Sequence, residues 1–433
     1  MAGSKILLAP LIAVVIAVIA GYVNLGSIYR TLRITGVLRV EKCAIASEGL
    51  QAIQVADTPH CEDLHHHLAS GLLFTACEAS WEARHSWFPP LAILEDASKA
   101  AQTPGAITVI DPQSMKAKRL RFEGFSGPFV THGIDILDDP QAKPGEAIFV
   151  FAVNHRPNQA QDSPAPKADS VIELFHHTIG ADFVRHIRTV KHDLIHTPND
   201  ILALSPTSFL VTNDHYYRDG LMRVVEDLYS GATWSNTIHV EFEMGMTEQN
   251  ETAQVQANVA LTGLHNNNGL GRGRTPDEVV LVSAASGEVY FGELTTTTGR
   301  VTVDIIDTFK ADSTLDNPSH FVDPYANDTY DASGFVLAGL SKAINLAHNS
   351  RLADARDGVM IWHLQDRSSP KSKRGKGSWE ARLLLQDNAD YIRTASAAVL
   401  VATDPAQSNG RREAWLFATG FMSRSILAVK IGL

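Results

Sequence analysis

Residues Asn199–Gly220 read NDILALSPTSFLVTNDHYYRDG, a stretch with two short apolar runs bounded by Asn, Pro and Asp. The two runs are Ile201–Leu204 and Ser208–Thr212, and their length and flanking turn residues are typical of neighbouring β-strands. Several further runs alternate apolar and polar residues, as half-buried strands do. Such runs recur at Gly145–Asn154, Val171–Phe175, Thr237–Glu243, Val279–Ser283, Glu288–Phe291, Val301–Ile306, Val359–Leu364 and Ala397–Ala402.

This pattern predicts an all-β protein. The chain has 433 residues, and a prior of about 150 residues per domain would allow two or three domains. Short strands at fairly regular spacing, with little helical signal between them, argue for a sandwich, a barrel or a propeller. Because the body is too long for a single sandwich, we expect a β-propeller. The sequence lacks a sharp WD or kelch repeat, so its periodicity does not give the number of blades.

The composition excludes some classes of protein. A formal charge of −11 argues against a nucleic-acid binder, which would carry a basic patch or a high pI. The hydrophobic fraction of 44% is ordinary for a globular protein with a large core. Three cysteines, Cys43, Cys61 and Cys77, are too few for a disulfide-dense scaffold, and their pairing cannot be read from the sequence.

The N-terminal segment Ile6–Leu25 is apolar, and no charged residue lies between Lys5 and Arg30. Its length suits a membrane-spanning helix, so we expect an uncleaved signal-anchor, with a cleaved signal peptide as the alternative. The flanking basic residues leave the orientation open. N-glycosylation sequons at Asn250 and Asn327 would suit a body on the lumenal or extracellular side. We therefore expect a protein of the secretory pathway, anchored in the membrane or secreted.

Pairs of acidic and amide residues adjoin several of the apolar runs. The pairs are Glu62-Asp63, Asn213-Asp214, Asn267-Asn268 and Asp316-Asn317. At strand ends, their oxygens could turn toward the axis of a propeller and share one ion, and Ca²⁺ prefers six to eight oxygen ligands. Taken singly, Asn and Asp are also common turn formers, so each pair alone is weak evidence.

The histidines suggest two kinds of chemistry. His192 and His196 have the spacing of zinc ligands on a helix, but the Thr197–Asp200 turn signal argues against a helix there. His132 and His155 each close a strand-like run, where a histidine could act as a general base toward water. The GLGRG sequence at Gly269–Gly273 lacks a P-loop Lys-Ser/Thr, and we interpret it as a turn.

Several segments together resemble the paraoxonase/arylesterase family. They are THGIDIL at Thr131–Leu137, FAVNH at Phe151–His155, VIELFHH at Val171–His177, IRTVKHDLI at Ile187–Ile195, and the opening stretch with its TNDHYY. The residues that carry the resemblance lie between about Cys61 and about Asn317, and a weaker resemblance continues to the end of the chain. The resemblance implies a six-bladed β-propeller over residues 41–433, behind the hydrophobic helix of residues 6–25, with two Ca²⁺ ions in a central tunnel.

The same resemblance implies roles for individual residues. Those implied for the catalytic ion are Glu62, Asn213, Asn268, Asp316 and Asn317. Those implied for the structural ion are Asp63, Asp214 and the backbone carbonyl of Ile134. His132 and His155 match a histidine dyad that would activate water. The implied activity is calcium-dependent hydrolysis of aryl esters and lactones; the alternatives are a calcium-stabilised propeller without catalysis and a strictosidine-synthase-like propeller.

The chain departs from the family pattern at several places. The family joins its N- and C-terminal ends by a disulfide, yet no cysteine here lies beyond Cys77, so closure of the propeller must rest on strand hydrogen bonds. Three stretches look like inserted loops: Arg156–Lys167, Thr247–Asn258 and Ser368–Gly377. Loops at the rim of the propeller would reshape the region where substrate specificity is set.

Overall fold

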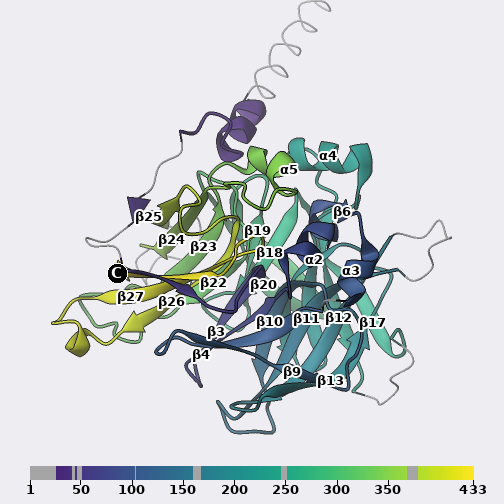
Figure 1. The fold of residues 1–433 in the computed structure, drawn as a ribbon, viewed down its shortest axis with the longest axis horizontal. Helices are drawn as coiled ribbons and strands as arrows, with labels where there is room; N and C mark the ends of the chain where they lie inside the picture. The colour runs from purple at the N-terminus through teal and green to yellow at the C-terminus, as the bar shows by residue number, and fades with distance from the viewer. Residues whose placement is uncertain are drawn as a thin grey trace, which may run out of the picture.

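The computed structural model describes residues 26–40, 44–45, 51–102, 104–158, 167–244, 251–367 and 379–433. Six antiparallel sheets of four main strands each succeed one another along the chain. The innermost strand of each sheet contacts the innermost strands of the two neighbouring sheets, and the last sheet contacts the first. The sheets therefore form a closed ring of six blades, which confirms the predicted six-bladed β-propeller (Figure 1).

Each blade begins at the axis and runs outward. Blade one comprises β3 (Cys61–His67), β4 (Leu72–Cys77), β7 (Ala106–Asp111) and β8 (Lys116–Arg119). Blade two comprises β10 (Thr131–Asp138), β11 (Ala147–Pro157), β12 (Ala168–Thr178) and β13 (Phe183–Val190), with β9 (Arg121–Glu123) parallel to its outer edge. Blade three comprises β14 (Pro198–Ser205), β15 (Ser208–Asn213), β16 (Ser235–Phe242) and β17 (Val255–Leu264).

The remaining three blades complete the ring. Blade four comprises β18 (Asn267–Arg272), β19 (Glu278–Ser283), β20 (Glu288–Thr297) and β21 (Arg300–Lys310). Blade five comprises β22 (Pro318–Phe321), β23 (Gly334–Leu340), β24 (Val359–Asp366) and β25 (Trp379–Asp387), with β1 (Ala44–Ile45) at its edge. Blade six comprises β26 (Ala395–Thr403), β27 (Glu413–Gly420), β28 (Ile426–Gly432) and the N-terminal β2 (Ala52–Val55).

The ring is closed by strand pairing between the two ends of the chain. β2 pairs antiparallel with β28, with Ala52 opposite Val429. Just after β2, the hydroxyl of Thr58 accepts a hydrogen bond from the Ile426 amide at 2.9 Å. The expectation that closure rests on strand hydrogen bonds is confirmed.

One disulfide lies inside blade one. Cys61 and Cys77 stand opposite each other on β3 and β4 and are bonded. Sequence reasoning had left this pairing open, and Cys43 lies outside the described residues. The bridge therefore braces one blade rather than the ring.

Six of the apolar clusters among the described residues each lie between two neighbouring blades. Between blades two and three, for example, Phe151 and Leu174 pack with Ile201 and Phe209. Since a sheet packed on both faces buries nearly every side chain, inner runs such as residues 147–155 are buried continuously instead of alternating. This explains why the sequence of many strands is continuously apolar.

Two sequence interpretations are wrong in detail. GLGRG was expected to be a turn, but Gly269 and Gly271 lie within β18. A Cβ on Gly269 would approach the Asp316 carbonyl to 2.5 Å, so glycine permits the close approach of β18 to β22 near the axis. The expected loop Thr247–Asn258 is shorter, because β17 begins at Val255.

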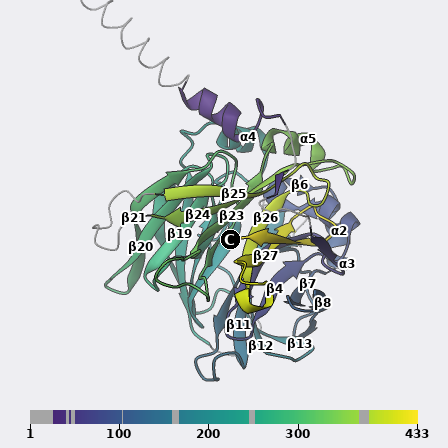
Figure 2. The same ribbon diagram turned by 90° about the vertical axis from the view of Figure 1, so that its left-hand side faces the viewer.

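Helical segments cover one end of the ring. Residues 26–34, α4 (Gly220–Leu228) and α5 (Leu346–Asn349) lie at the same end in both views (Figures 1 and 2). Shorter segments at this end are η1 (Pro89–Leu91) and η2 (Ala343–Asn345). Among the described residues, no helix is long and apolar enough to cross a membrane. The predicted anchor at residues 6–25 lies outside them.

We predict that replacing both Cys61 and Cys77 by Ala lowers the free energy of unfolding by about 3 kcal/mol, the value expected for a loop of about 15 residues. The bridge spans a sequence separation of 16 residues. Chemical denaturation of the oxidised wild type and the double variant measures the difference. Peptide mapping without reductant should yield a Cys61–Cys77 peptide; a peptide that joins Cys43 to either residue would contradict the assignment.

Candidate functional site

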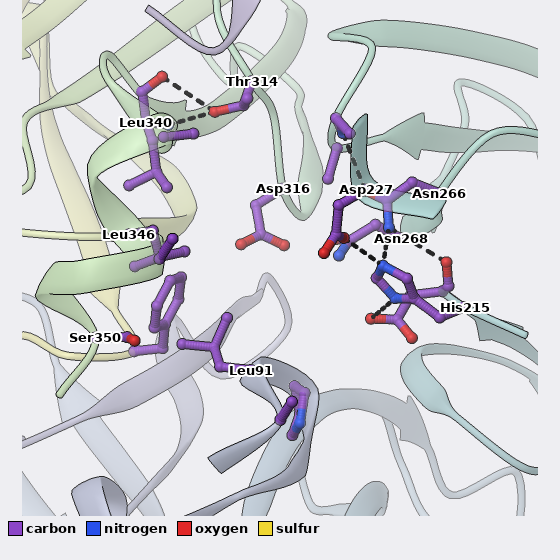
Figure 3. A pocket seen from close by; sticks show the side chains of 18 of the residues that line it. Leu91, His215, Asp227, Asn266, Asn268, Thr314, Asp316, Leu340, Leu346 and Ser350 are labelled. Atoms are coloured by element: carbon purple, nitrogen blue, oxygen red, sulfur yellow. Dashed lines mark hydrogen bonds and ion pairs between the residues drawn. The ribbon is translucent and has the colours of Figure 1, made fainter. Parts of the chain in front are cut away.

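A cavity of about 520 Å³ opens at the helical end of the ring axis. Its floor is polar and includes Glu62, His132, Asn199, Asn268 and Asp316. Its walls are mainly apolar and come from η1, α4, η2, α5 and the loops beside them. They include Phe88, Leu91, Val224, Leu228, Leu340, Ile344, Leu346 and Phe421. Figure 3 shows the Asp316 carboxylate pointing into this space, with no dashed line to a neighbour.

The floor residues occupy equivalent places in successive blades. Glu62, His132, Asn199 and Asn268 are each the second residue of an innermost strand, and Asn317 directly precedes β22. In blades one to four and in blade six, the pairing register of the inner strand shifts at this point. Such β-bulges re-aim side chains. The repeated irregularity thus turns one polar side chain per blade toward the axis.

Most of these side chains carry an oxygen that has no hydrogen-bond partner within the part of the chain that the structure describes. The oxygens are Glu62 Oε2, Asn199 Oδ1, Asn268 Oδ1, Asp316 Oδ1 and Asn317 Oδ1. Leaving a buried polar atom unpaired costs about 1–3 kcal/mol, so a cluster of them indicates a missing ligand. Asn317 Nδ2 donates to Glu62 Oε1 at 3.0 Å, which holds two of the oxygens side by side.

The two carboxyl groups of the floor repel each other. Burial, and then the charges of Asp316 and Asp63, raise the pKa of Glu62 well above its ordinary value. Burial, with Asp63 and Asp214, raises the pKa of Asp316 in the same way. Within the described ranges, no three His, Cys, Asp or Glu side chains are grouped as a metal site. The cluster instead mixes two carboxylates with three amides, and a cation would relieve the repulsion.

The stretch Asn199–Gly220 contains two Asn-Asp pairs, Asn199-Asp200 and Asn213-Asp214, and their asparagines differ in their surroundings. Asn213 ends β15, and its Oδ1 accepts from the amides of His196 and Thr197 at 3.0 Å each. Its Nδ2 donates to Leu194 O and to Asn236 Oδ1, so its hydrogen-bonding capacity is used up. Asn199, which the sequence interpretation passed over, lines the cavity with an unpaired oxygen. The structure therefore places Asn199, and not Asn213, on the floor.

The residues expected at a second ion are engaged with other protein groups. The carboxylate of Asp63 accepts from the backbone amides of Leu64 and Ile134. Asp214 Oδ2 lies 3.1 Å from His215 Nδ1 and accepts from Asn199 Nδ2 at 3.3 Å. Although burial opposes it, His215 keeps the pKa of Asp214 below its ordinary value.

His132 and His155 form a hydrogen-bonded pair beside the floor. His132 Nδ1 lies 3.0 Å from His155 Nε2, and His155 Nδ1 lies 2.8 Å from the Ser170 hydroxyl. Burial lowers the pKa of His132 to about 4. Burial, and then His132, lower the pKa of His155 well below its ordinary value. Both rings are therefore neutral at pH 7, and a neutral imidazole can accept a proton from water.

The prediction that His192 and His196 do not lie on a helix is confirmed, because residues 191–197 contain only turns, bends and irregular backbone. Sequence reasoning missed a different histidine contact. His215 Nε2 lies 2.7 Å from Asp227 Oδ1 on α4, and Asn266 Nδ2 lies 3.1 Å from the same nitrogen (Figure 3). This contact ties α4 to the floor. No local sequence pattern could reveal it, because α4 and the floor meet only in the folded ring.

The chain is similar to known esterases in sequence. The Arylesterase family model matches residues 96–260. Serum paraoxonase/arylesterase 2 from Gallus gallus is 35% identical over 146 residues, which cover 33% of this chain and 37% of that protein. The Homo sapiens serum paraoxonase/arylesterase 2 is 28% identical over 201 residues, which cover 43% of this chain and 49% of that protein. The chain thus spans about half or less of the length of these curated relatives.

Two solved structures can be superposed on most of the chain at low sequence identity. A luciferin-regenerating enzyme matches with a TM-score of 0.45 at 10% identity, covering 89% of this chain and 96% of that one. A gluconolactonase from Xanthomonas campestris matches with a TM-score of 0.42 at 12% identity, covering 90% of this chain and 95% of that one.

We predict that Glu62→Gln stabilises the chelator-treated protein at pH 8. The folded-state pKa of Glu62 is raised, so its stabilising protonated form is lost as the pH rises through that value. Glutamine carries no such charge, so its advantage in Tm should be largest at high pH and shrink as the pH falls toward 5. Thermal unfolding of both proteins in EDTA across this range measures it. A lower Tm for the variant at pH 8 would contradict the assigned repulsion.

Proposed function

Because this chain belongs to the paraoxonase/arylesterase family, we propose that it hydrolyses aryl esters and lactones at the floor of the cavity. The observation that carries the proposal is the meeting, in one cavity, of unpaired buried oxygens with His132, whose ring contacts His155. A propeller that only needed stabilising would have no use for a general base beside an open cavity. This favours an enzyme over a purely structural protein.

The floor fits the calcium ion that the family resemblance implies. Ca²⁺ takes six to eight oxygen ligands from carboxylates, amides, carbonyls and water. Five side chains offer unpaired oxygens: Glu62, Asn199, Asn268, Asp316 and Asn317. In this proposal, Asn199 replaces Asn213 among the implied ligands. When bound, Ca²⁺ would polarise the substrate carbonyl and stabilise the negative charge that develops on its oxygen.

The histidine pair supplies the proton chemistry. His132 lines the cavity and removes a proton from the attacking water. His155 Nε2, held by Ser170 through Nδ1, fixes the tautomer and orientation of His132 through the 3.0 Å contact with its Nδ1. The Pro198 carbonyl and the Asp214 carboxylate favour the protonated form of His132 that results.

The walls select the substrate and limit access of water. Phe88 packs edge-on against His132 with ring centroids 5.5 Å apart. Leu91, Val224, Leu228 and Ile344 surround the space above it. Such a cavity, apolar except for its floor, suits an ester or lactone that carries an apolar group.

We further propose that residues 6–25 attach the protein to a membrane of the secretory pathway. Exposed apolar side chains at the cavity end support this: Ile28, Tyr29, Leu221, Val224 and Leu228. The 2.6 Å contact between the Ser27 and Ser230 hydroxyls places residues 26–34 beside the end of α4. Asn327 lies exposed in a turn, accessible to glycosylation on the lumenal side, whereas Asn250 lies outside the described residues.

We predict that His132→Gln lowers kcat for phenyl acetate and for a lactone by about 10²- to 10⁴-fold, the range for loss of a general base. EDTA should abolish the activity of the wild type, and added calcium should restore it. His176 contacts Asp139 beyond the opposite end of β10, so His176→Gln is a matched control that should keep normal turnover. Full activity of the wild type in EDTA would overturn the role of calcium.

We predict that Asn199→Ala weakens calcium binding at least about tenfold, because it removes one oxygen ligand. Asn213→Ala should leave calcium affinity unchanged and lower Tm, because it breaks four internal hydrogen bonds. Isothermal titration of folded protein, checked by circular dichroism, separates the two effects. Loss of affinity in the Asn213 variant alone would restore the original ligand assignment.

A further inference from the structure

The carboxylates deeper in the tunnel differ from those of the floor in that their oxygens are bonded to protein donors. Asp63 Oδ1 accepts from its neighbour Leu64 N at 2.7 Å. Asp63 Oδ2 accepts from Ile134 N at 3.0 Å and lies 3.0 Å from His65 Nε2. The oxygens of Asp63 are therefore already engaged at the place where the family resemblance implies a second calcium ion.

The imidazole of His65 stands between two carboxylates. Its Nε2 contacts Asp63, and its Nδ1 lies 3.6 Å from Asp135 Oδ1. Both carboxylates are buried, with side-chain exposures of 3% and 2%. One ring thus offers a nitrogen to each of two acids that would otherwise face each other.

A guanidinium binds the second of these acids. Arg272 Nη2 lies 2.6 Å from Asp135 Oδ2, and Arg272 also donates to the carbonyls of Ala203 and Ile136. Arginine stays charged at every working pH. A permanent positive charge from β18 is therefore fixed beside Asp135 of β10.

The residues implied for a second ion are engaged with other protein groups. Ile134 donates its backbone amide to Asp63. Asp214 is bonded to His215 and to Asn199 at the cavity instead. None of the oxygens of Asp63, Asp135 or Asp200 is among the unpaired buried atoms of the described residues, in contrast to those of the floor.

We infer that the chain holds one calcium ion, at the floor of the cavity, and that His65 and Arg272 take the place of the second ion. The inference rests on the proposed function for the floor ion, and it concerns this chain's own residues at the deeper site. Protein groups then contact the carboxylates of Asp63 and Asp135 in place of the ion. The ring keeps its deep tunnel assembled whether or not calcium is bound.

The test is the calcium content of the full chain after dialysis against micromolar free calcium, measured by mass spectrometry of the metal and by titration calorimetry. The wild type should retain one ion per chain. Asn199→Ala combined with Glu62→Gln should retain none while staying folded by circular dichroism. Two ions in the wild type, or one ion left in the floor variant, would overturn the inference.

A second variant tests whether His65 prevents a second calcium ion from binding. His65→Asp adds a carboxylate beside Asp63 and removes the ring, so calcium content should rise to two ions per chain. The matched control His66→Asp, on the next residue of β3, should keep one. A His65→Asp protein that folds with one ion contradicts the exclusion. Phenyl acetate hydrolysis by the wild type separates the two proposals. Two bound ions with normal activity would contradict only this inference. A wild type that binds no ion and has no activity would contradict the proposed function.

Discussion

Carboxylates on the innermost strands accept hydrogen bonds from backbone amides of the next blade, and the arrangement of the blades depends on these contacts. Asp63 of blade one accepts from Ile134 N of blade two, Asp135 of blade two from Ala203 N of blade three, and Asp200 of blade three from Leu270 N of blade four. Each of these acids also accepts from the amide of the residue that follows it. Hydrogen bonds to charged groups contribute about 1.5–3 kcal/mol each, so these bonds set the order and spacing of the blades at the axis.

This arrangement divides the polar residues of the inner strands into two sets. The acids that bind neighbouring blades are satisfied by protein donors. The residues one position earlier, such as Glu62 and Asn199, are turned the other way by the bulges and keep unpaired oxygens. Buried unpaired oxygens destabilise the fold unless a ligand completes them. The acids that are bonded to neighbouring blades therefore stabilise the same inner strands that carry the unpaired oxygens of the floor.

The strand pattern predicted the β-propeller, and the family resemblance named several residues of the cavity. Glu62, Asn268, Asp316 and His132, all named from the sequence, line one cavity, and His155 contacts His132. Asn199 was missed because two Asn-Asp pairs follow each other in the same stretch, and only the bulge at the start of β14 shows which one faces the axis. The Cys61–Cys77 bridge was not foreseen, because cross-strand pairing depends on a register that the sequence does not display. The contact of Asp227 with His215 joins elements that only the closed ring brings together.

Closure of the ring also supports the reactive floor directly. The hydroxyls of Ser396 and Thr419, both in blade six, donate to the carbonyl of Glu62 in blade one, and Asn317 of the segment before β22 donates to its carboxylate. Glu62 is thus held by the last two blades as well as by its own. Since β2 joins the N-terminus to the last blade, loosening that strand would shift Glu62 against the other floor residues. The pairing of the two chain ends therefore contributes to the geometry of the cavity floor, because Glu62 is held by residues from the end of the chain.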